Sequence, residues 1–287
     1  MILVTGARGV VGTPLCEALK GSNMGFLPVS RSGGEGAFQW NLASESEIVP
    51  VSLKDSLKGI QSLIHCAPIW LLPTHLMLLK ECGLEQIVVF SSTSVLSKQG
   101  SENQQERSLV KLLKDAESSL IEFCRQENID LTILRPSLIY GYARDQNVSH
   151  IAKFIKRYRL MFLVGEANGL RQPVHADDLV RTAIDCLGRP ERQQIAYNLA
   201  GKDVLSYKHM VERIFDGLGR RARIFSIPLA LFRFALICAA KLGRFSYTPE
   251  MANRMNQNLN YDYSAAVRDL GFKPQGFLEE PKRDLPQ

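Results

Sequence analysis

Three glycines near the start of the chain have the spacing of a phosphate-binding turn. Gly6, Gly9 and Gly12 follow the short apolar run Ile2–Thr5 and precede a helical pattern over Thr13–Lys20. Glycines at such positions allow a tight turn, the approach of backbone N–H groups to a pyrophosphate, and close packing of helix on strand. The N-terminus of the helix adds partial positive charge. The alternative is an ordinary glycine-rich surface turn. We expect a dinucleotide site that includes Gly6, Arg8, Gly9, Val10 and Gly12.

The segment after the second apolar run indicates which dinucleotide binds. It reads Val29-Ser30-Arg31-Ser32 and has no carboxylate at its tip. An acid at this place binds the adenosine ribose of NAD, whereas a cation binds the 2′-phosphate of NADP. An arginine can hold a phosphate with two hydrogen bonds, and neighbouring hydroxyls can add more. Ser30 and Arg31 therefore predict NADP, with NAD less favoured, unless Arg31 is an ordinary surface arginine.

The pattern of apolar runs predicts the elements that carry these residues. Short apolar or β-branched runs alternate with helix-like segments, at Ile2–Thr5, Phe26–Val29, Ser62–Cys66, Gln86–Phe90 and Leu131–Leu134. This alternation predicts an α/β fold with a doubly wound parallel sheet, as in the Rossmann fold. Runs such as Ile87–Phe90 are continuously apolar, as strands covered on both faces should be.

The pattern changes to helical segments after about residue 190. They are Tyr207–Leu218, Pro228–Leu242 and Ala265–Leu270. We therefore expect a Rossmann domain over 1–190, with 142–170 contributing to a substrate cleft. A smaller, mostly helical region that covers the substrate is expected over 191–287.

Composition narrows the functional classes. Of the 287 residues, 45% are hydrophobic and 22% are charged, which excludes a disordered or fibrous chain. The formal net charge of +6 comes from scattered basic residues, so we expect an anionic small-molecule ligand and no nucleic acid. The six cysteines form no CxxC pair, and no signal-peptide pattern opens the sequence. These features predict no metal site and a reducing, cytoplasmic compartment.

Four further motifs follow the glycine turn along nearly the whole chain. After the GxxGxxG turn come His65-Cys66-Ala67-Pro68, Ser91-Ser92-Thr93-Ser94-Val95, the segment 134–141 (LRPSLIYG) and the segment 173–179 (PVHADDL). With these motifs the chain resembles the extended or atypical branch of the short-chain dehydrogenase/reductase superfamily, the NAD-dependent epimerase/dehydratase proteins. The resemblance implies that further residues line the cofactor, namely Asn41, Cys66, Ala67, Pro68, Ser91 and Pro136. Asn41 stands where relatives carry an acid that touches the adenine.

The same resemblance points to an unusual catalytic group. In the superfamily a Ser or Thr works with a Tyr and a Lys of a YxxxK helix, and the Tyr moves a proton at the substrate oxygen. Here Ser92 stands in the hydroxyl position, but Leu109 and Leu113 occupy the Tyr and Lys positions. If the chain is an enzyme, Tyr140 or Tyr142 is a candidate replacement, although Tyr140 is equally suited to packing. If it is not, the chain is a nucleotide-binding sensor, scaffold or assembly factor.

Two later segments bear on the substrate and on partners. The segment 142–163 is rich in Lys and Arg, which suits an anionic diphosphate or a solvated helix face. Pro228–Leu242 is an apolar helical pattern with basic residues around it, at Arg220, Arg221, Arg223, Arg233, Lys241 and Arg244. Packing on the second region is the favoured explanation, ahead of a membrane surface or a partner subunit. The resemblance thus implies an NADP-dependent oxidoreductase or epimerase acting on a nucleotide-sugar-like substrate, and an oligomer is possible.

Overall fold

The computed structural model describes the chain except for residues 35, 45–48, 102, 189–194, 229 and 233–253. Most of the predicted helix Pro228–Leu242, with Arg233, Lys241 and Arg244, lies outside the described residues. The chain divides into two compact units. Unit 1 comprises Met1–Pro136, Ala176–Leu199 and Asp262–Lys273, and unit 2 comprises Ser137–His175, Ala200–Tyr261 and Pro274–Gln287. The two units therefore alternate along the chain, whereas the sequence pattern predicts one boundary, near residue 190.

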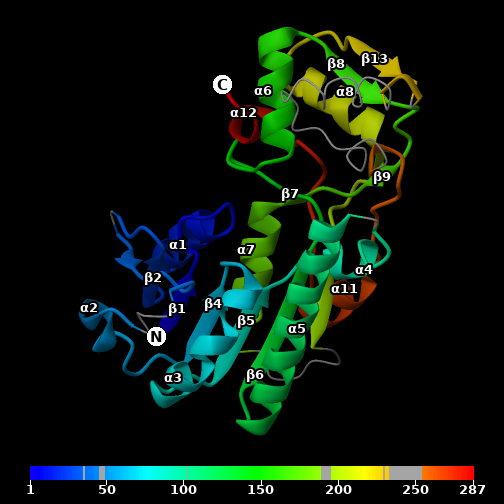
Figure 1. Ribbon diagram of the computed structural model, residues 1–287. Helices are drawn as coiled ribbons and strands as arrows, with labels where there is room; N and C mark the ends of the chain where they lie inside the picture. The colour runs from blue at the N-terminus through cyan, green and yellow to red at the C-terminus, as the bar shows by residue number, and fades with distance from the viewer. Residues whose placement is uncertain (35, 45–48, 102, 189–194, 229, 233–253) are drawn as a thin grey trace. The chain divides into compact units, whose positions relative to one another are not determined.

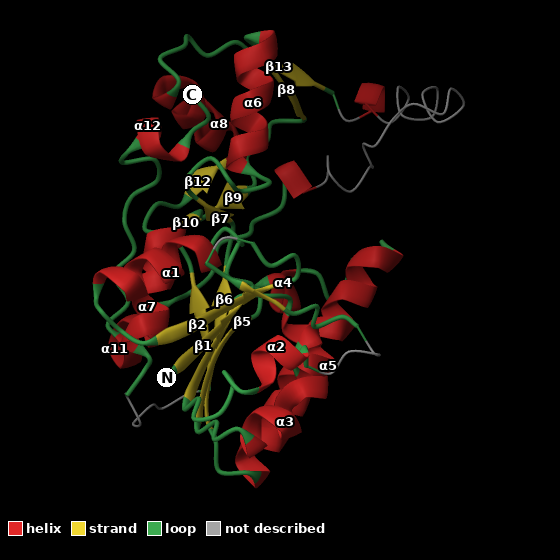
Figure 2. Ribbon diagram, turned by 90° about the vertical axis from the view of Figure 1, so that its left-hand side faces the viewer, coloured by secondary structure: helices red, strands yellow, loops and turns green. Residues whose placement is uncertain are grey.

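A parallel sheet of seven strands forms the centre of unit 1 (Figures 1 and 2), in the order β11-β6-β5-β4-β1-β2-β3. The strands are β1 (Ile2–Thr5), β2 (Phe26–Ser30), β3 (Phe38–Gln39), β4 (Ser62–His65), β5 (Gln86–Phe90), β6 (Asp130–Pro136) and β11 (Ala196–Leu199). Every neighbouring pair is parallel. The predicted doubly wound α/β sheet is confirmed, with β3 and β11 as additional edge strands.

Helices cover both faces of this sheet. Figure 2 shows α1 (Gly12–Gly21), α7 (Ala176–Asp185) and α11 (Ser264–Leu270) on one side, and α2 (Val51–Lys54), α3 (Leu76–Glu81) and α5 (Gln104–Gln126) on the other. Three short elements complete the unit, namely η1 (Ile69–Leu71), η2 (Pro73–His75) and α4 (Ser94–Ser97). The long helix α5 is capped by Asn103, whose side chain accepts hydrogen bonds from the backbone N–H groups of Gln105 and Glu106.

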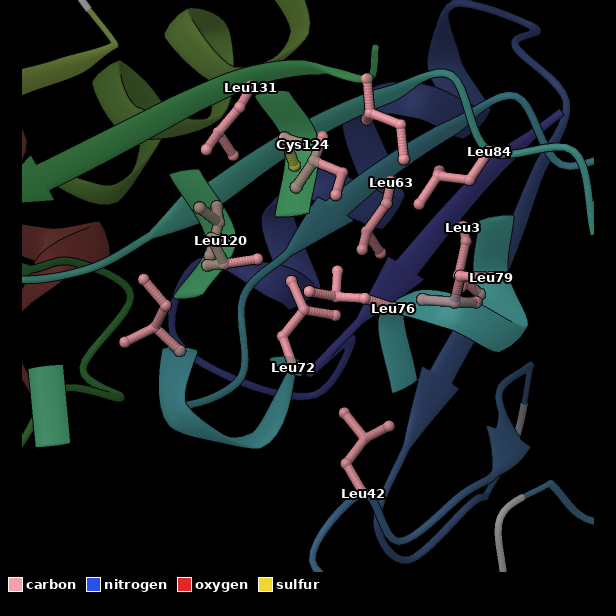
Figure 3. Close-up of a cluster of buried hydrophobic side chains, with 14 of the residues drawn as sticks. Leu3, Leu42, Leu63, Leu72, Leu76, Leu79, Leu84, Leu120, Cys124 and Leu131 are labelled. Atoms are coloured by element: carbon pink, nitrogen blue, oxygen red, sulfur yellow. The ribbon is translucent and has the colours of Figure 1, made fainter. Parts of the chain in front are cut away.

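Leucines from strands and helices meet in the main core of unit 1 (Figure 3). Leu3 of β1 and Leu63 of β4 lie among Leu72, Leu76 and Leu79 from the segment before and within α3. Leu120 and Cys124 enter the same cluster from α5. The apolar run of β5, Ile87–Phe90, is buried along its whole length. The two-sided burial of the central strands explains why their sequences do not alternate between apolar and polar residues.

Unit 2 combines helices with three small sheets. Parallel pairs join β7 (Ile139–Tyr140) to β10 (Val174–His175), and β8 (Met161–Val164) to β13 (Ile224–Ile227). An antiparallel pair joins β9 (Leu170–Arg171) to β12 (Leu205–Ser206). Helices among the described residues of this unit include α6 (Val148–Tyr158), α8 (Tyr207–Gly217) and α12 (Pro281–Asp284). Within the described ranges, no helix is both long and apolar enough to cross a bilayer.

Candidate functional site

The glycine turn connects β1 to α1, and two of its glycines are required by the backbone. Gly6 has a φ of +70°, and a Cβ there would lie 2.6 Å from the backbone nitrogen of Ala67. A Cβ on Gly12 would lie 2.1 Å from the carbonyl oxygen of Gly6. At Gly9 the nearest atom, the Gly6 oxygen, would be 3.2 Å away. Packing therefore excludes side chains at Gly6 and Gly12 more strongly than at Gly9. The N-cap residue of α1, Val11, has no side chain that accepts a hydrogen bond. No capping side chain therefore competes with a bound anion for the first backbone N–H groups of the helix.

Arg8 extends from the glycine turn to the loop after β2. Its guanidinium donates hydrogen bonds to the Gly33 carbonyl oxygen at 2.8 Å and to the Ser32 hydroxyl at 3.3 Å. The Ser30 hydroxyl donates to the same carbonyl at 3.1 Å, and Arg31 is exposed beside it. Two arginines and two serines therefore gather at the carboxyl end of β2. The sequence predicts that Arg8 belongs to the turn. It does not predict that the side chain reaches the loop after β2, because this contact depends on the pairing of β1 with β2.

A buried histidine joins the ends of β1 and β4 beside Gly6. The Nδ1 atom of His65 lies 2.7 Å from the Thr5 hydroxyl, and its Nε2 atom lies 3.2 Å from the Pro68 carbonyl oxygen. Burial lowers the pKa of His65 to about 4, because it disfavours the charged imidazolium. A neutral ring with its proton on Nε2 satisfies both contacts, since Nε2 donates to Pro68 and Nδ1 accepts from Thr5. This histidine holds the backbone of Cys66 and Ala67 against the glycine turn.

Asn41 and Cys66, two other predicted cofactor residues, have different surroundings. The Asn41 side-chain oxygen accepts a hydrogen bond from the backbone N–H of Ala43 at 3.3 Å. Trp40, next to it, is buried with its ring edge-on to His75, at 5.0 Å between ring centres. Burial raises the pKa of the Cys66 thiol, so this cysteine is a neutral group and not a nucleophile. Their proposed contact with a nucleotide stays a prediction.

The carboxyl end of β5 is tied to α5 and β6 by a charged network that sequence reasoning missed. Glu117 of α5 is only 5% exposed and accepts hydrogen bonds from both the Nε and the terminal nitrogen of Arg135 on β6. The Ser91 hydroxyl donates to the same carboxylate at 2.5 Å. The signal available in the sequence was an acidic residue on the helix face that also holds Leu113 and Leu109, four and eight positions earlier.

Ser92 lies in the loop between β5 and α4, next to this network. Its hydroxyl oxygen is 3.1 Å from the Ser94 hydroxyl and accepts a hydrogen bond from the Ser94 N–H at 3.1 Å. The loop is fixed to the end of β6, because the Thr93 N–H donates to the Pro136 carbonyl oxygen at 3.1 Å. Ser91, Ser92 and Pro136 are thus brought together at one end of the sheet, the end at which parallel α/β sheets bind ligands.

Apolar side chains occupy the face of α5 where a tyrosine and a lysine are expected. Leu113 is 3% exposed and belongs to the main core, and Leu109 packs against that core. Lys111 and Lys114 are exposed, and Lys111 pairs with Asp115 at 2.5 Å. On this helix, therefore, neither leucine position offers a group that transfers protons.

The two candidate tyrosines belong to unit 2 and differ in their surroundings. The Tyr140 ring is buried, and its hydroxyl donates to the Gly276 carbonyl oxygen and accepts from the Leu278 N–H, each at 3.1 Å. Tyr142 is half-buried with a φ of +57°, and the Arg283 guanidinium lies over its ring at 5.3 Å. Both hydrogen bonds of the Tyr140 hydroxyl hold the C-terminal segment in place, which favours a structural role for Tyr140.

A buried contact between His175 and Asp284 fixes the backbone around Tyr142. The Nε2 atom of His175 lies 3.0 Å from a carboxylate oxygen of Asp284, and that oxygen accepts the Tyr142 N–H at 3.3 Å. Burial opposes ionisation of Asp284, but hydrogen bonds from His175 and Arg283 lower the pKa of this carboxyl below its usual value. The last turn of the chain therefore positions the loop after β7.

Comparison with known proteins finds similarity to one family over part of the chain. Residues 73–200 match the model of the NAD dependent epimerase/dehydratase family. An uncharacterised protein of Sinorhizobium fredii is 25% identical over 54% of this chain and 38% of its own length. The chain thus spans well under half of that relative. Subunit 9 of the NADH dehydrogenase [ubiquinone] 1 alpha subcomplex, mitochondrial, from Dictyostelium discoideum is 23% identical over 97% of this chain and 80% of its own length.

A similar arrangement is found among solved structures. UDP-glucose 4-epimerase of Thermotoga maritima, solved with UDP-glucose, has a TM-score of 0.72 at 17% identity, over 98% of this chain and 96% of that one. This likeness establishes the fold. The chain therefore has a Rossmann-like sheet of seven parallel strands, and its residues 73–200 match the NAD dependent epimerase/dehydratase family model.

Proposed function

We propose that the protein binds NADP in unit 1 and uses it in the oxidoreduction or epimerisation of a nucleotide-sugar-like substrate. The glycine turn carries the proposal, because Gly6 and Gly12 are required by the backbone, whereas a Cβ on Gly9 would meet the Gly6 oxygen at 3.2 Å. The family match supports a nicotinamide dinucleotide in general. The UDP-glucose in the similar epimerase supports the choice of substrate class.

The group of polar side chains after β2 supports NADP over NAD. Arg8 and Arg31 come from different segments and reach the same loop, which also contains the Ser30 and Ser32 hydroxyls. The segment 30–34 has no carboxylate that would favour a free ribose. Guanidinium groups and hydroxyls are suitable ligands for a 2′-phosphate.

Cofactor preference tests this part of the proposal. Calorimetric titration should show tighter binding of NADPH than of NADH. Arg31→Ala and Arg8→Ala should each weaken NADPH binding by roughly tenfold to a hundredfold, the loss of one charge-assisted contact, and leave NADH binding nearly unchanged. Arg125→Ala, at an exposed arginine of α5, is the matched control. A preference for NADH, or an unchanged preference in both variants, would show that the loop after β2 does not recognise phosphate.

The glycine turn can be tested separately. Gly9→Val should abolish binding of both nucleotides while the circular dichroism spectrum is retained, since a branched side chain would fill the space that the pyrophosphate needs. Gly12→Val should instead unfold or destabilise the protein, because its Cβ would overlap the Gly6 carbonyl group. Normal nucleotide affinity in a folded Gly9→Val protein would remove the phosphate role.

The chemistry requires a proton donor or acceptor at the substrate oxygen. Hydride exchange is supplied by the nicotinamide when it is bound, so the chain must orient the substrate and handle the proton. Ser92 is the proposed hydrogen-bond donor to the substrate oxygen. Tyr142 is the proposed proton donor, because it is half-buried beside the Arg283 guanidinium, whereas the Tyr140 hydroxyl makes two hydrogen bonds to the C-terminal segment.

A second function is favoured by the apolar helix face and by one relative. Leu109 and Leu113 remove the usual acid–base pair, and the Dictyostelium relative is a subunit of a larger assembly. A dinucleotide-binding sensor, scaffold or assembly factor with little turnover would retain the glycine turn but not the catalytic pair.

Turnover distinguishes the two functions. NADPH oxidation should be followed over a panel of keto-sugar nucleotides and other carbonyl compounds, in wild type, Ser92→Ala, Tyr142→Phe and Tyr140→Phe proteins. Loss of one acid–base group should lower the rate by about a hundredfold to ten-thousandfold in Ser92→Ala and Tyr142→Phe, and Tyr140→Phe should affect stability more than rate. A protein that binds NADPH and turns over no member of the panel would support the sensor or scaffold function.

A further inference from the structure

One end of unit 2 concentrates basic residues without acidic ones. The segments 148–164 and 218–228 together hold seven Lys and Arg residues and no Asp or Glu. These two short segments therefore carry more positive charge than the formal +6 of the whole chain. From its sequence, the first segment is expected to bind a substrate diphosphate or to form a solvated helix face, and the second borders an apolar helical pattern. In the structure the two segments lie side by side.

The pairing of β8 with β13 brings the two segments together. Met161 pairs with Ile224, and the Met161 N–H donates to the Arg223 carbonyl oxygen at 2.9 Å. The Arg220 guanidinium donates to the Ile155 and Lys156 carbonyl oxygens, at 3.3 and 3.0 Å, at the end of α6. Arg220 therefore stabilises the helix end, while other arginines of both segments are exposed, at Arg157, Arg159, Arg221 and Arg223.

Two phenylalanines occupy the outward face of the same strand pair. Met161, Leu163 and Ile224 pack into the core of unit 2. Phe162 and Phe225, one position along in each strand, are 47% and 53% exposed, and their ring centres are 5.8 Å apart. Large apolar side chains packed on each other in solvent are unusual in a free surface and mark an interaction site.

We propose that this basic-aromatic surface, made of Arg157, Arg159, Arg221, Arg223, Phe162 and Phe225, docks the protein on a bilayer with anionic headgroups. Phenylalanines enter the boundary between headgroups and acyl chains, and arginines around them bind lipid phosphates. The surface uses no residue of the glycine turn or of the β5 loop. The proposal is therefore independent of the function proposed above.

The arrangement of the rings favours a lipid surface over a nucleic acid. Single-stranded nucleic acids stack their bases on separate aromatic faces. Phe162 and Phe225 are paired in register and lie against each other with an angle of 37° between their planes, so they form one apolar patch. A continuous apolar patch among cations fits the bilayer interface.

Vesicle flotation with the full chain tests the proposal. The protein should float with vesicles of equal parts phosphatidylcholine and phosphatidylglycerol, and stay behind with phosphatidylcholine alone. Arg221→Gln/Arg223→Gln should weaken binding on the order of twentyfold, roughly fivefold for each cation near an anionic surface. Phe162→Ser/Phe225→Ser should weaken it by roughly tenfold for each ring removed from the bilayer.

Lys202→Gln/Lys208→Gln is the matched control, because both lysines are exposed in unit 2 away from the two segments. It should bind vesicles like wild type, and circular dichroism should show that all variants are folded. The proposal is overturned if wild type ignores the phosphatidylglycerol vesicles, or if the control loses as much affinity as the arginine variant. It is also overturned if the phenylalanine variant binds vesicles normally but loses binding to a single-stranded oligonucleotide.

Discussion

His65 shows how one buried residue can make the whole fold sensitive to pH. Its pKa is about 4 in the folded protein and near the ordinary 6.5 in the unfolded chain, because burial disfavours the charged ring. Between these two pH values the unfolded chain binds a proton that the folded chain does not. Stability must therefore fall as the pH falls from 6.5 to 4, by about 3 kcal/mol over the whole window.

Urea denaturation of wild type and His65→Gln checks this prediction. Glutamine offers a donor and an acceptor near the Thr5 hydroxyl and the Pro68 carbonyl but does not titrate in this range. The wild type should lose about 2 kcal/mol more than the variant between pH 7 and pH 5. Equal losses in the two proteins would mean that His65 is not the titrating group. The lowered pKa of Asp284 acts below this window, since its ordinary value is 3.8.

Single residues also show the limit of what spacing can predict. The glycine turn can be predicted from the sequence, because only glycine suits the positive φ of Gly6 and the short distance between Gly12 and the Gly6 carbonyl oxygen. The reach of Arg8 to Gly33 depends on β1 pairing with β2, a long-range contact that no local pattern contains. The same holds for Glu117, whose partner Arg135 is brought to it by the packing of α5 on the sheet.

At the scale of elements, α5 and β6 are joined through the buried pair of Glu117 and Arg135. Glu117→Ala would leave the Arg135 guanidinium, whose side chain is 22% exposed, without its partner. We expect a loss of about 3 kcal/mol in the free energy of unfolding. The double variant Glu117→Leu/Arg135→Leu should lose less than the single one, because it leaves no unpaired buried charge.

Urea denaturation at neutral pH measures both variants. Glu122→Ala is the matched control, since Glu122 forms an exposed pair with Arg125 on the same helix and should have no resolvable effect. If Glu117→Ala were as stable as wild type, the network would not hold the β5 loop, and Ser91 and Ser92 would need another support.

Element prediction succeeded where packing and local pattern agree. The five apolar runs became strands because each is buried in the sheet, and α5 follows its helical pattern behind an Asn103 cap. β3 has two residues, and β11 reads Ala-Tyr-Asn-Leu, with one asparagine and no β-branched residue. Such short edge strands form through pairing with β2 and β6, so their sequences alone carry little signal.

At the scale of the whole molecule, unit 1 is assembled from three separate stretches of the chain. Its last strand, β11, pairs with β6, and its last helix, α11, packs on β11. The Tyr197 hydroxyl of β11 donates to Asp269 of α11 at 3.1 Å, and the Tyr197 ring is buried. A single cut near residue 190 would therefore separate parts of one core.

A fragment of residues 1–190 tests this organisation. It lacks β11 and α11, so the edge of β6 and the apolar surface around Tyr197 would lose their cover. An uncovered strand edge with apolar neighbours aggregates readily. We expect the fragment to be insoluble, or to unfold without a cooperative transition in urea, whereas the full chain unfolds cooperatively. Cooperative unfolding of the fragment at the urea midpoint of the full chain would show that residues 1–190 form an independent domain and that the second and third stretches of unit 1 are dispensable for its core.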